Sequence, residues 1–236
     1  MTKKVALITG ASRGIGLSIS KKLYEDGFEI FGTSTSGNGD NKYVDHWLKA
    51  DFSEEKGIDE FLLKLEKISN IYALINNAGI NIIKTPGDIT IEDYQVIQRV
   101  NLEAPFRISQ KLAPLMAINN EGKIINIASI WSVVSKTNRS LYSTMKTGLL
   151  GMTRALAIDW AKYNILINSI SPGFVETELT SKSLMLEEQN SIKNQIPIKR
   201  FAQPKEIAEI ASFLCSKKNT YLTGQNIIID GGFTIV

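Results

Sequence analysis

Tyr142 and Lys146 stand four residues apart in a stretch that predicts a helix over residues 140–162, so their side chains share one face. A tyrosine with a pKa near 10 is a poor base at neutral pH, and lowering that pKa to about 7 requires roughly 4 kcal/mol of preferential stabilisation of the phenolate. An ammonium group one helical turn away supplies part of it. The pair predicts a phenol that transfers a proton, although such pairs also occur by chance on surface helices.

A hydroxyl and an amide-rich turn are expected near this pair. Ser129 ends a strand-like run thirteen residues before Tyr142, and Asn76–Gly79 ends another. In an open parallel sheet, ligands bind beyond the carboxyl ends of the strands, so both lie on the binding edge. Ser129 is therefore predicted to hold a substrate oxygen.

Asn101 lies within the predicted helix 90–118, four residues before Pro105. Proline has no N–H, so the Asn101 carbonyl loses its helical partner if the helix continues. Such a carbonyl can hold a water molecule, or it can mark a local kink without a function.

A glycine-rich loop, Thr9–Gly16, follows the first predicted strand and opens the first predicted helix. Glycine allows close approach of backbone to a ligand, and a helix N-terminus offers free N–H groups to a pyrophosphate. The spacing of Gly10, Gly14 and Gly16 differs from the GxGxxG fingerprint of dinucleotide sites. The loop therefore favours a dinucleotide by its position between strand and helix, and a purely structural turn is the alternative.

The second predicted strand indicates which dinucleotide is bound. Sites for NAD usually carry an acidic residue about 20 residues beyond the loop, to hold the ribose 2′-hydroxyl. Here the strand exits as 32–37 with no acid before Asp40, while Arg13 projects from the glycine loop and Thr33 and Thr35 add hydroxyls. A cation with hydroxyls suits a 2′-phosphate, so we predict NADP(H). A solvated Arg13 beside a plain turn is the alternative.

The elements that must position these residues alternate along the whole chain. Apolar, β-branched runs begin at Val5, Glu29, Tyr72, Lys123, Ile165 and Asn226, and a weaker run ends at Asp51. Helical stretches lie at 14–26, 54–68, 90–118, 140–162 and 204–217. This alternation predicts an α/β fold: a single-domain, Rossmann-like, doubly wound sheet of mostly seven parallel strands with helices on both faces. Residues 1–236 form one domain, with a mobile substrate-side insert expected near 177–200.

The composition restricts the class of protein. The chain has 236 residues, 43% hydrophobic and 22% charged, and a net charge of +3, which is too mild to indicate a nucleic-acid or membrane partner. Cys215, the single cysteine, lies in an apolar run and favours a reducing compartment. No run approaches a membrane span, so a cytoplasmic protein is expected. His46 is the only histidine, and the sequence predicts no metal site.

Together these motifs resemble the short-chain dehydrogenase/reductase family in its short, one-domain form, over essentially the whole chain. The resemblance rests on Thr9–Gly16, Asn76–Gly79, the set Asn101, Ser129, Tyr142 and Lys146, and the segment 172–177. It implies that Tyr142 is the general acid, that Ser129 polarises the carbonyl, that Lys146 lowers the pKa of Tyr142 and binds ribose, and that Asn101 holds a water. The cofactor residues it implies are Gly10, Ser12, Arg13, Gly14, Ile15, Gly16, Thr35, Asp51, Phe52, Asn77, Gly79, Tyr142, Lys146, Val175 and Thr177.

Within the family, the chain most resembles 3-oxoacyl-(acyl-carrier-protein) reductases of fatty acid biosynthesis, in residues 8–16, 32–36 and 221–225. Those reductases place basic residues near the site entrance, whereas the corresponding positions here are taken to be Asn120 and Tyr163. Trp131 is bulky where a long acyl chain must enter, and it is either a wall for a sugar or ring, or ordinary core packing. A 3-oxoacyl thioester is the preferred substrate, and a sugar or other small ketone is the alternative.

Two other classes of protein fit less well. An extended-family epimerase needs a substrate domain that 236 residues hardly accommodate, and a non-catalytic dinucleotide sensor would have lost Tyr142, Lys146 or Ser129. The resemblance also implies a homotetramer built on the helices 90–118 and 140–162 and on the last strand.

Overall fold

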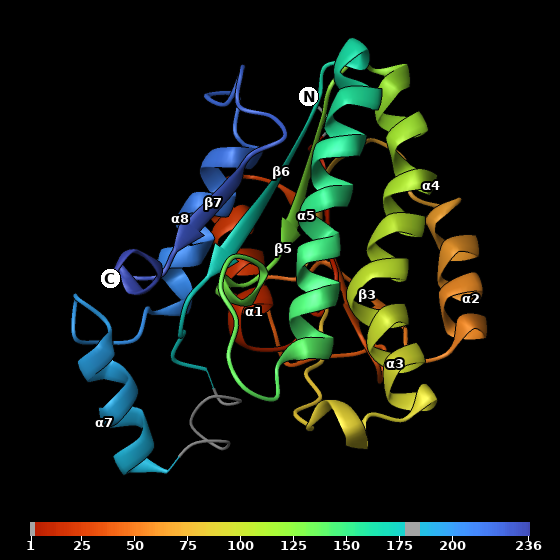
Figure 1. Cartoon of the computed structure of the whole chain (residues 1–236). Helices are drawn as coiled ribbons and strands as arrows, with labels where there is room; N and C mark the ends of the chain where they lie inside the picture. Colours follow the sequence, from red (N-terminus) through yellow and green to blue (C-terminus); the bar gives the residue numbers. More distant parts are fainter. Residues whose placement is uncertain (1–2, 178–184) are drawn as a thin grey trace.

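Seven strands form the centre of the chain, whose computed structural model describes residues 3–177 and 185–236 (Figure 1). They are β1 (Val5–Ile8), β2 (Glu29–Ser34), β3 (His46–Lys49), β4 (Ile71–Asn76), β5 (Gly122–Ile127), β6 (Ile165–Pro172) and β7 (Asn226–Ile229). All pair in parallel, in the order β3-β2-β1-β4-β5-β6-β7. Every residue of β1, β4, β5 and β6 is buried, which explains why apolar residues predominate on both faces of these strands. The predicted fold class is confirmed.

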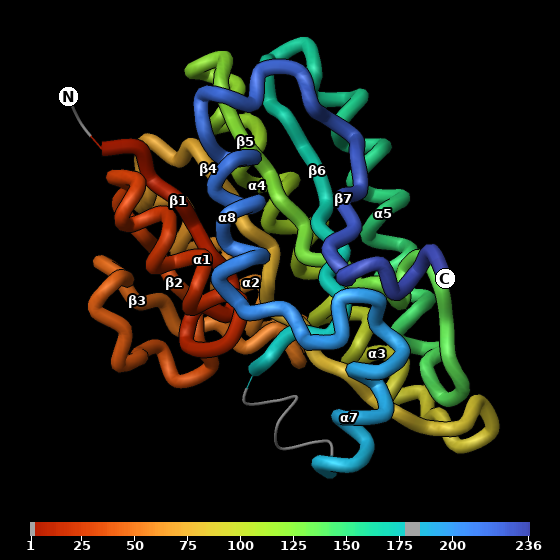
Figure 2. The backbone as a smooth tube through the Cα atoms, turned by 90° about the vertical axis from the view of Figure 1, so that its left-hand side faces the viewer, coloured from red at the N-terminus to blue at the C-terminus, as the bar shows by residue number. Residues whose placement is uncertain are grey.

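Helices cover both faces of this sheet. One face packs against α2 (Glu55–Leu65), α4 (Ala104–Ile118) and α5 (Ser140–Trp160), and the other against α1 (Gly14–Glu25) and α8 (Pro204–Cys215) (Figures 1 and 2). Phe61, Ile108 and Leu149 fill the first core, and Ile19 and Leu214 the second. Because the strands are parallel, all their carboxyl ends meet at one edge of the sheet.

The helical stretch predicted over 90–118 is confirmed over 91–118, with a π-helical turn inside it. Helix α3 (Ile91–Gln98) is followed by a π-helical turn, η2 (Arg99–Glu103), and then by α4. In η2 the N–H of Ala104 donates to the carbonyl of Arg99, five residues back. Pro105 has no N–H and crowds the carbonyl four residues before it, and the wider turn accommodates this. The structure therefore widens the helix at Asn101.

The insert expected at 177–200 falls partly outside the described residues, because 178–184 are not among them. The remainder contains α7 (Leu186–Gln195), which the sequence did not predict as a helix. None of its residues is buried, so it carries no apolar stripe that would have indicated a helix. The mobility of the insert stays a prediction. Within the described residues, no helix is both long enough and apolar enough to cross a bilayer.

Candidate active site

The glycine-rich loop joins the carboxyl end of β1 to α1. Gly10 and Gly14 have φ angles of +67° and +56°, which glycine adopts without side-chain strain. At Gly16 there is no room for a side chain, because a Cβ there would lie 2.1 Å from the carbonyl oxygen of Gly10. The first turn of α1 thus packs directly on the loop, and its free N–H groups are available to an anion.

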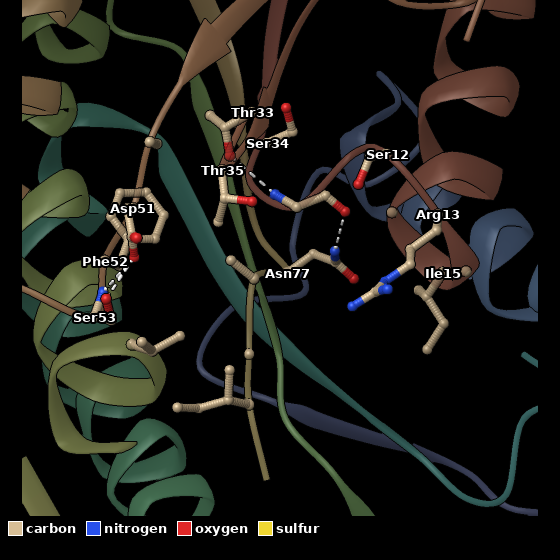
Figure 3. Close-up of a pocket in the computed structure, with 18 of the residues that line it drawn as sticks. Ser12, Arg13, Ile15, Thr33, Ser34, Thr35, Asp51, Phe52, Ser53 and Asn77 are labelled. Atoms are coloured by element: carbon tan, nitrogen blue, oxygen red, sulfur yellow. Dashed lines mark hydrogen bonds between the residues drawn. The ribbon is translucent and has the colours of Figure 1, made fainter. Parts of the chain in front are cut away.

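Asn77, directly after β4, fixes this loop from the neighbouring strand. Its Nδ2 donates to the carbonyls of Thr9 at 2.9 Å and of Gly10 at 3.0 Å, the latter drawn in Figure 3. Its backbone N–H donates to the Thr9 hydroxyl at 2.9 Å. Asn77 was predicted to border a ribose; it lines the cavity described next, and its side-chain nitrogen holds the loop.

A cavity of about 510 Å³ opens between the glycine loop, the ends of β2 and β3 and the turn after β4 (Figure 3). Most residues predicted to bind the dinucleotide line it: Gly10, Ser12, Arg13, Gly14, Ile15, Gly16, Thr35, Asp51, Phe52, Asn77, Gly79 and Thr177. Ser34, Ser36 and Ser53 also line it and were not singled out from the sequence. Size, glycine loop and helix N-terminus together fit a dinucleotide.

The end of β2 separates the two threonines that the sequence grouped together. Thr33 also lines the cavity, but it is only 1% exposed and its hydroxyl accepts the Gly10 N–H at 3.0 Å, so its contact with a 2′-phosphate stays a prediction. Thr35 is exposed and lines the cavity, into which the Arg13 side chain extends (Figure 3). Asp40 is exposed and is not among the lining residues. Within residues 3–177 and 185–236, no side-chain hydrogen bond or ion pair engages the Arg13 guanidinium.

Asp51 and Phe52 close the far end of the cavity, after β3. The hydroxyl and N–H of Ser53 donate to the Asp51 carboxylate at 2.7 and 3.0 Å and hold its pKa below the usual value. The Phe52 ring is buried and packs edge-on against Phe61, with centroids 5.3 Å apart. Asp51 therefore stays ionised, and the Phe52 ring belongs mainly to the core.

Ser129, Tyr142 and Lys146 converge at the carboxyl edge of the sheet, as predicted. Ser129 follows β5, and its hydroxyl accepts the N–H of Trp131 at 3.2 Å and lies within hydrogen-bonding reach of the Tyr142 phenol. Tyr142 and Lys146 lie in the first two turns of α5, with Nζ of Lys146 5.7 Å from the tyrosine ring centroid. Helix α5 packs across the η3 turn (Ile130–Ser132), which brings the three side chains together.

Lys146 lies between the Ser129–Tyr142 pair and the cavity. Its buried Nζ donates to the Ile127 carbonyl at 2.7 Å, and burial lowers its pKa to about 8. A Cβ on Gly79, which lines the cavity, would lie 3.5 Å from this Nζ and 3.4 Å from Oδ1 of Asn101. The proton-transfer set and the cavity are therefore adjacent.

Asn101 holds the turn after β4 rather than facing open space. Its Oδ1 accepts the N–H of Ile80 at 2.9 Å, and its Nδ2 donates to the carbonyl of the same residue at 2.8 Å. The side chain is fully buried in the π-helical turn η2. This pairing positions the turn beside Lys146, and a water on the Asn101 carbonyl stays a prediction.

The pKa of Tyr142 differs from what the sequence led us to expect. Burial raises the pKa of the phenol above its ordinary value, while the Ser129 hydroxyl and the Arg139 cation act to lower it. Lys146 donates to Ile127 and is not among the groups that shift it. The protein's own groups thus keep Tyr142 protonated at neutral pH, the form needed to donate a proton to a carbonyl.

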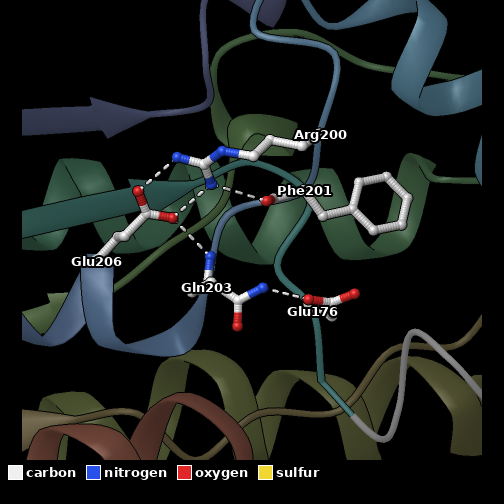
Figure 4. A network of polar contacts seen from close by, with 5 residues as sticks. All are labelled: Glu176, Arg200, Phe201, Gln203 and Glu206. Atoms are coloured by element: carbon white, nitrogen blue, oxygen red, sulfur yellow. Dashed lines mark hydrogen bonds and ion pairs between the residues drawn. The ribbon is translucent and has the colours of Figure 1, made fainter.

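The segment after β6 completes the cavity on the other side. Val175 is buried and pairs with Ala202, and a Cβ on Gly14 would lie 3.4 Å from Cγ2 of Thr177. A polar network anchors the segment to α8: Gln203 donates to Glu176, and Arg200 binds Glu206 through two contacts of 2.7 and 2.8 Å (Figure 4). Val175 and Thr177 are thereby held near the glycine loop.

Trp131 forms an aromatic cluster beside Ser129. Its ring meets Phe174 and Phe233 edge-on, at centroid distances of 6.1 and 6.3 Å, and those two rings lie 5.4 Å apart. Arg139, immediately before α5, lies over the Trp131 ring with its Cζ 5.8 Å from the centroid. The sequence analysis missed Arg139, Phe174 and Phe233. The position of Arg139, three residues before Tyr142 and thus on the same helix face, could have indicated it.

Three other residues that the sequence analysis discussed, Asn120, Tyr163 and His46, do not lie at the carboxyl edge of the sheet. Asn120 and Tyr163 precede β5 and β6, so they sit at the amino ends of the strands and not at the site entrance, which corrects the correspondence drawn above. His46 begins β3 and contacts Glu29 at 2.8 Å. No group of three or more His, Cys, Asp or Glu suited to a metal occurs within the described part of the chain.

Comparisons with known proteins agree with this geometry. The family model described as enoyl-(acyl-carrier-protein) reductase matches residues 10–234. The chain is 35% identical to the 3-oxoacyl-(acyl-carrier-protein) reductase FabG of Aquifex aeolicus, over 97% of this chain and 96% of that one. It is 32% identical to the NAD-dependent glycerol dehydrogenase of Listeria innocua, covering 100% and 95%.

Among solved structures, the chain superposes on YwfH, an NADPH-dependent reductase involved in bacilysin biosynthesis. The TM-score is 0.89 at 28% identity, and the match covers 98% of both chains. The glycerol dehydrogenase uses NAD and YwfH uses NADPH, so proteins similar to this chain differ in their cofactors.

Proposed function

Because the chain belongs to the short-chain dehydrogenase/reductase family of oxidoreductases, we propose that it reduces a ketone to a secondary alcohol at the expense of NADPH. The dinucleotide, when bound, supplies the hydride. Ser129 donates a hydrogen bond to the carbonyl oxygen, and Tyr142 gives that oxygen its proton. Lys146 binds the ribose hydroxyls and thereby orients the dinucleotide beside Tyr142. The proposal rests on the convergence of Ser129, Tyr142 and Lys146 beside the cavity.

The preference for NADP(H) is supported by the groups at the end of β2. Arg13 and Thr35 line the cavity and Asp40 does not, so a 2′-phosphate meets a guanidinium and a hydroxyl. Titration with NADPH and NADH tests this. We expect tighter binding of NADPH than of NADH. Arg13→Gln should lower the affinity for NADPH at least tenfold more than it lowers the affinity for NADH. Arg154→Gln, an exposed arginine on α5, is the control. Tighter NADH binding by the unmodified protein would refute the preference.

The 3-oxoacyl thioester is the first substrate to test, because the reductase from Aquifex aeolicus resembles this chain over nearly its full length. A small ketone, of a sugar or another metabolite, is the second candidate. The cluster of Trp131, Phe174 and Phe233 favours it, because three bulky rings near Ser129 suit a small ketone better than a long acyl chain. Values of kcat/KM for acetoacetyl thioesters and for a panel of ketones decide between the two.

We also propose that the protein works as a homotetramer in the cytoplasm. Exposed apolar side chains on the outer helices support assembly: Phe106 and Ile118 on α4 and Ile158 on α5. The fully buried thiol of Cys215 fits a reducing compartment. Light scattering after size exclusion tests the tetramer, and a monomer at micromolar concentration would refute it. No nucleic-acid or membrane partner is proposed.

A further inference from the structure

We propose that Arg139 binds an oxyanionic group, a carboxylate or phosphate, of the ketone substrate, and that Trp131 forms the wall against which this group is held. The inference rests on the proposed function and specifies its substrate class. It predicts that the substrate carries its negative charge near the carbonyl that Ser129 and Tyr142 contact.

The first support is the position of Arg139. It is the residue before α5 and stands three residues ahead of Tyr142, so the two share a face of the helix start. The charge of its guanidinium acts on the Tyr142 phenol, and its Cζ lies 5.8 Å from the Trp131 ring centroid. Trp131 itself follows Ser129 by two residues. A cation thus stands close to the proposed reacting group.

The second support is that no described residue provides this cation with an anionic partner. Within residues 3–177 and 185–236, the Arg139 side chain makes no ion pair or hydrogen bond, although it is half-buried and burial lowers its pKa. By contrast, Arg107 binds Asp59 and Arg200 binds Glu206. A partly desolvated cation without a counter-ion is costly, and a ligand oxyanion would compensate for that cost.

The third support is the geometry that the aromatic cluster imposes. Trp131 packs edge-on against Phe174 and Phe233, which come from two other segments of the chain, so its ring is fixed from several sides. The Arg139 guanidinium lies over this indole, with its Cζ 5.8 Å from the centroid, and its N–H groups can bind an oxyanion through two parallel hydrogen bonds. The pair therefore forms a preorganised site for a planar carboxylate or a phosphate.

Matched ketones that differ in charge test the proposal. The pairs are acetoacetate with methyl acetoacetate, pyruvate with methyl pyruvate, and dihydroxyacetone phosphate with dihydroxyacetone. For each pair, the ratio of kcat/KM for the anionic over the neutral ketone is measured with NADPH in the unmodified protein, in Arg139→Gln and in Arg139→Lys. Lys136→Gln is the control, since it removes the same charge from an exposed side chain in the same loop.

We expect the unmodified protein to prefer the anionic member of at least one pair by tenfold or more. That ratio should fall at least tenfold in Arg139→Gln, recover partly in Arg139→Lys and stay unchanged in Lys136→Gln. The pair with the largest effect tells carboxylate from phosphate. A ratio near one in the unmodified protein overturns the proposal, as does an equal loss on both members accompanied by a shifted pH profile. In the latter case, Arg139 acts only on the pKa of Tyr142 and does not bind the substrate.

A binding measurement separates this proposal from the proposed function. Calorimetric titration of the protein saturated with NADP⁺ uses 3-hydroxybutyrate and its methyl ester as probes. Preferential, Arg139-dependent binding of the acid without turnover of any ketone would support the anion site and refute the reductase. Turnover of neutral ketones, with neither an acid preference nor Arg139-dependent binding, would support the reductase and refute the anion site.

Discussion

Nζ of Lys146 lies 5.7 Å from the ring centroid of Tyr142 and donates its hydrogen bond to the carbonyl of Ile127. The ammonium is thus held by the end of β5 at a fixed place between the tyrosine and the dinucleotide cavity. This arrangement fits the proposed role of Lys146 in binding and orientation. In the proposed reaction, the proton comes from Tyr142.

Replacing the phenol tests that assignment directly. Tyr142→Phe keeps the ring and removes only the hydroxyl, so we expect kcat to fall by about a thousandfold, within the range of general acid catalysis. The affinity for NADPH should change less than threefold, since no predicted phosphate contact is lost. Ketone-dependent oxidation of NADPH and fluorescence titration give the two values. A kcat within tenfold of the unmodified protein would show that another group donates the proton.

The buried ammonium of Lys146 predicts a characteristic pH dependence of stability. Burial lowers its pKa from 10.5 to about 8, so between these values the unfolded chain binds more protons than the folded one. The free energy of unfolding contributed by this group therefore rises with pH across that window. Urea unfolding at pH 7 to 10 should show a rise for the unmodified protein relative to Lys146→Met.

Because other groups titrate in the same range, the difference between these two proteins is the quantity to follow. Lys56→Met, with an 82% exposed side chain, serves as the control and should give parallel curves. Parallel curves for Lys146→Met as well would contradict a depressed pKa at this position.

Gly16 gives a steric prediction for the dinucleotide loop. A Cβ at this position would stand 2.1 Å from a backbone oxygen, so Gly16→Ala must displace the loop or the start of α1. We expect at least a tenfold loss in affinity for NADPH and a lower melting temperature. Gly87→Ala is the matched control, because no atom lies within 4 Å of its Cβ. Unchanged binding by Gly16→Ala would mean that the loop does not contact the phosphates.

The network in Figure 4 predicts an acid-dependent anchor for the segment 174–177. Hydrogen bonding to Arg200 lowers the pKa of Glu206 from 4.5 to about 2. The stabilisation is therefore complete above pH 4.5 and is lost as the pH falls through about 2. Because Arg200 is 51% exposed and Glu206 36% exposed, Glu206→Gln should lower the free energy of unfolding at pH 7 by no more than about 1 kcal/mol.

This difference between Glu206→Gln and the unmodified protein should shrink between pH 4.5 and 2 in chemical unfolding curves. A second readout is the affinity for NADPH, which should weaken severalfold as the segment carrying Val175 and Thr177 loosens. Glu187→Gln on α7 removes a charge from an exposed position and should change neither. A pH-independent difference would exclude the Arg200–Glu206 pair as its source.

The sequence by itself determined the parallel sheet and the partners of the proton-transfer set. Runs such as Val5–Ile8 are apolar on both faces because helices cover both faces of the sheet, so the pattern is visible in the local sequence. The four-residue spacing of Tyr142 and Lys146 is likewise a local property of one helix. Parallel strands then place Ser129 at the same edge without further information.

Only the tertiary structure decided how individual polar groups are used. Thr33 and Thr35 look equivalent in sequence and both line the cavity, but packing of the glycine loop on β2 buries the first and pairs its hydroxyl with the Gly10 N–H, whereas the second is exposed. Arg139 becomes a candidate binding residue only in the folded protein, where Trp131, Phe174 and Phe233 form a cluster beside it. Contacts between such distant segments leave no local sequence pattern. The sequence did not predict helix α7 because the helix buries none of its residues. A helix of this kind needs no apolar stripe.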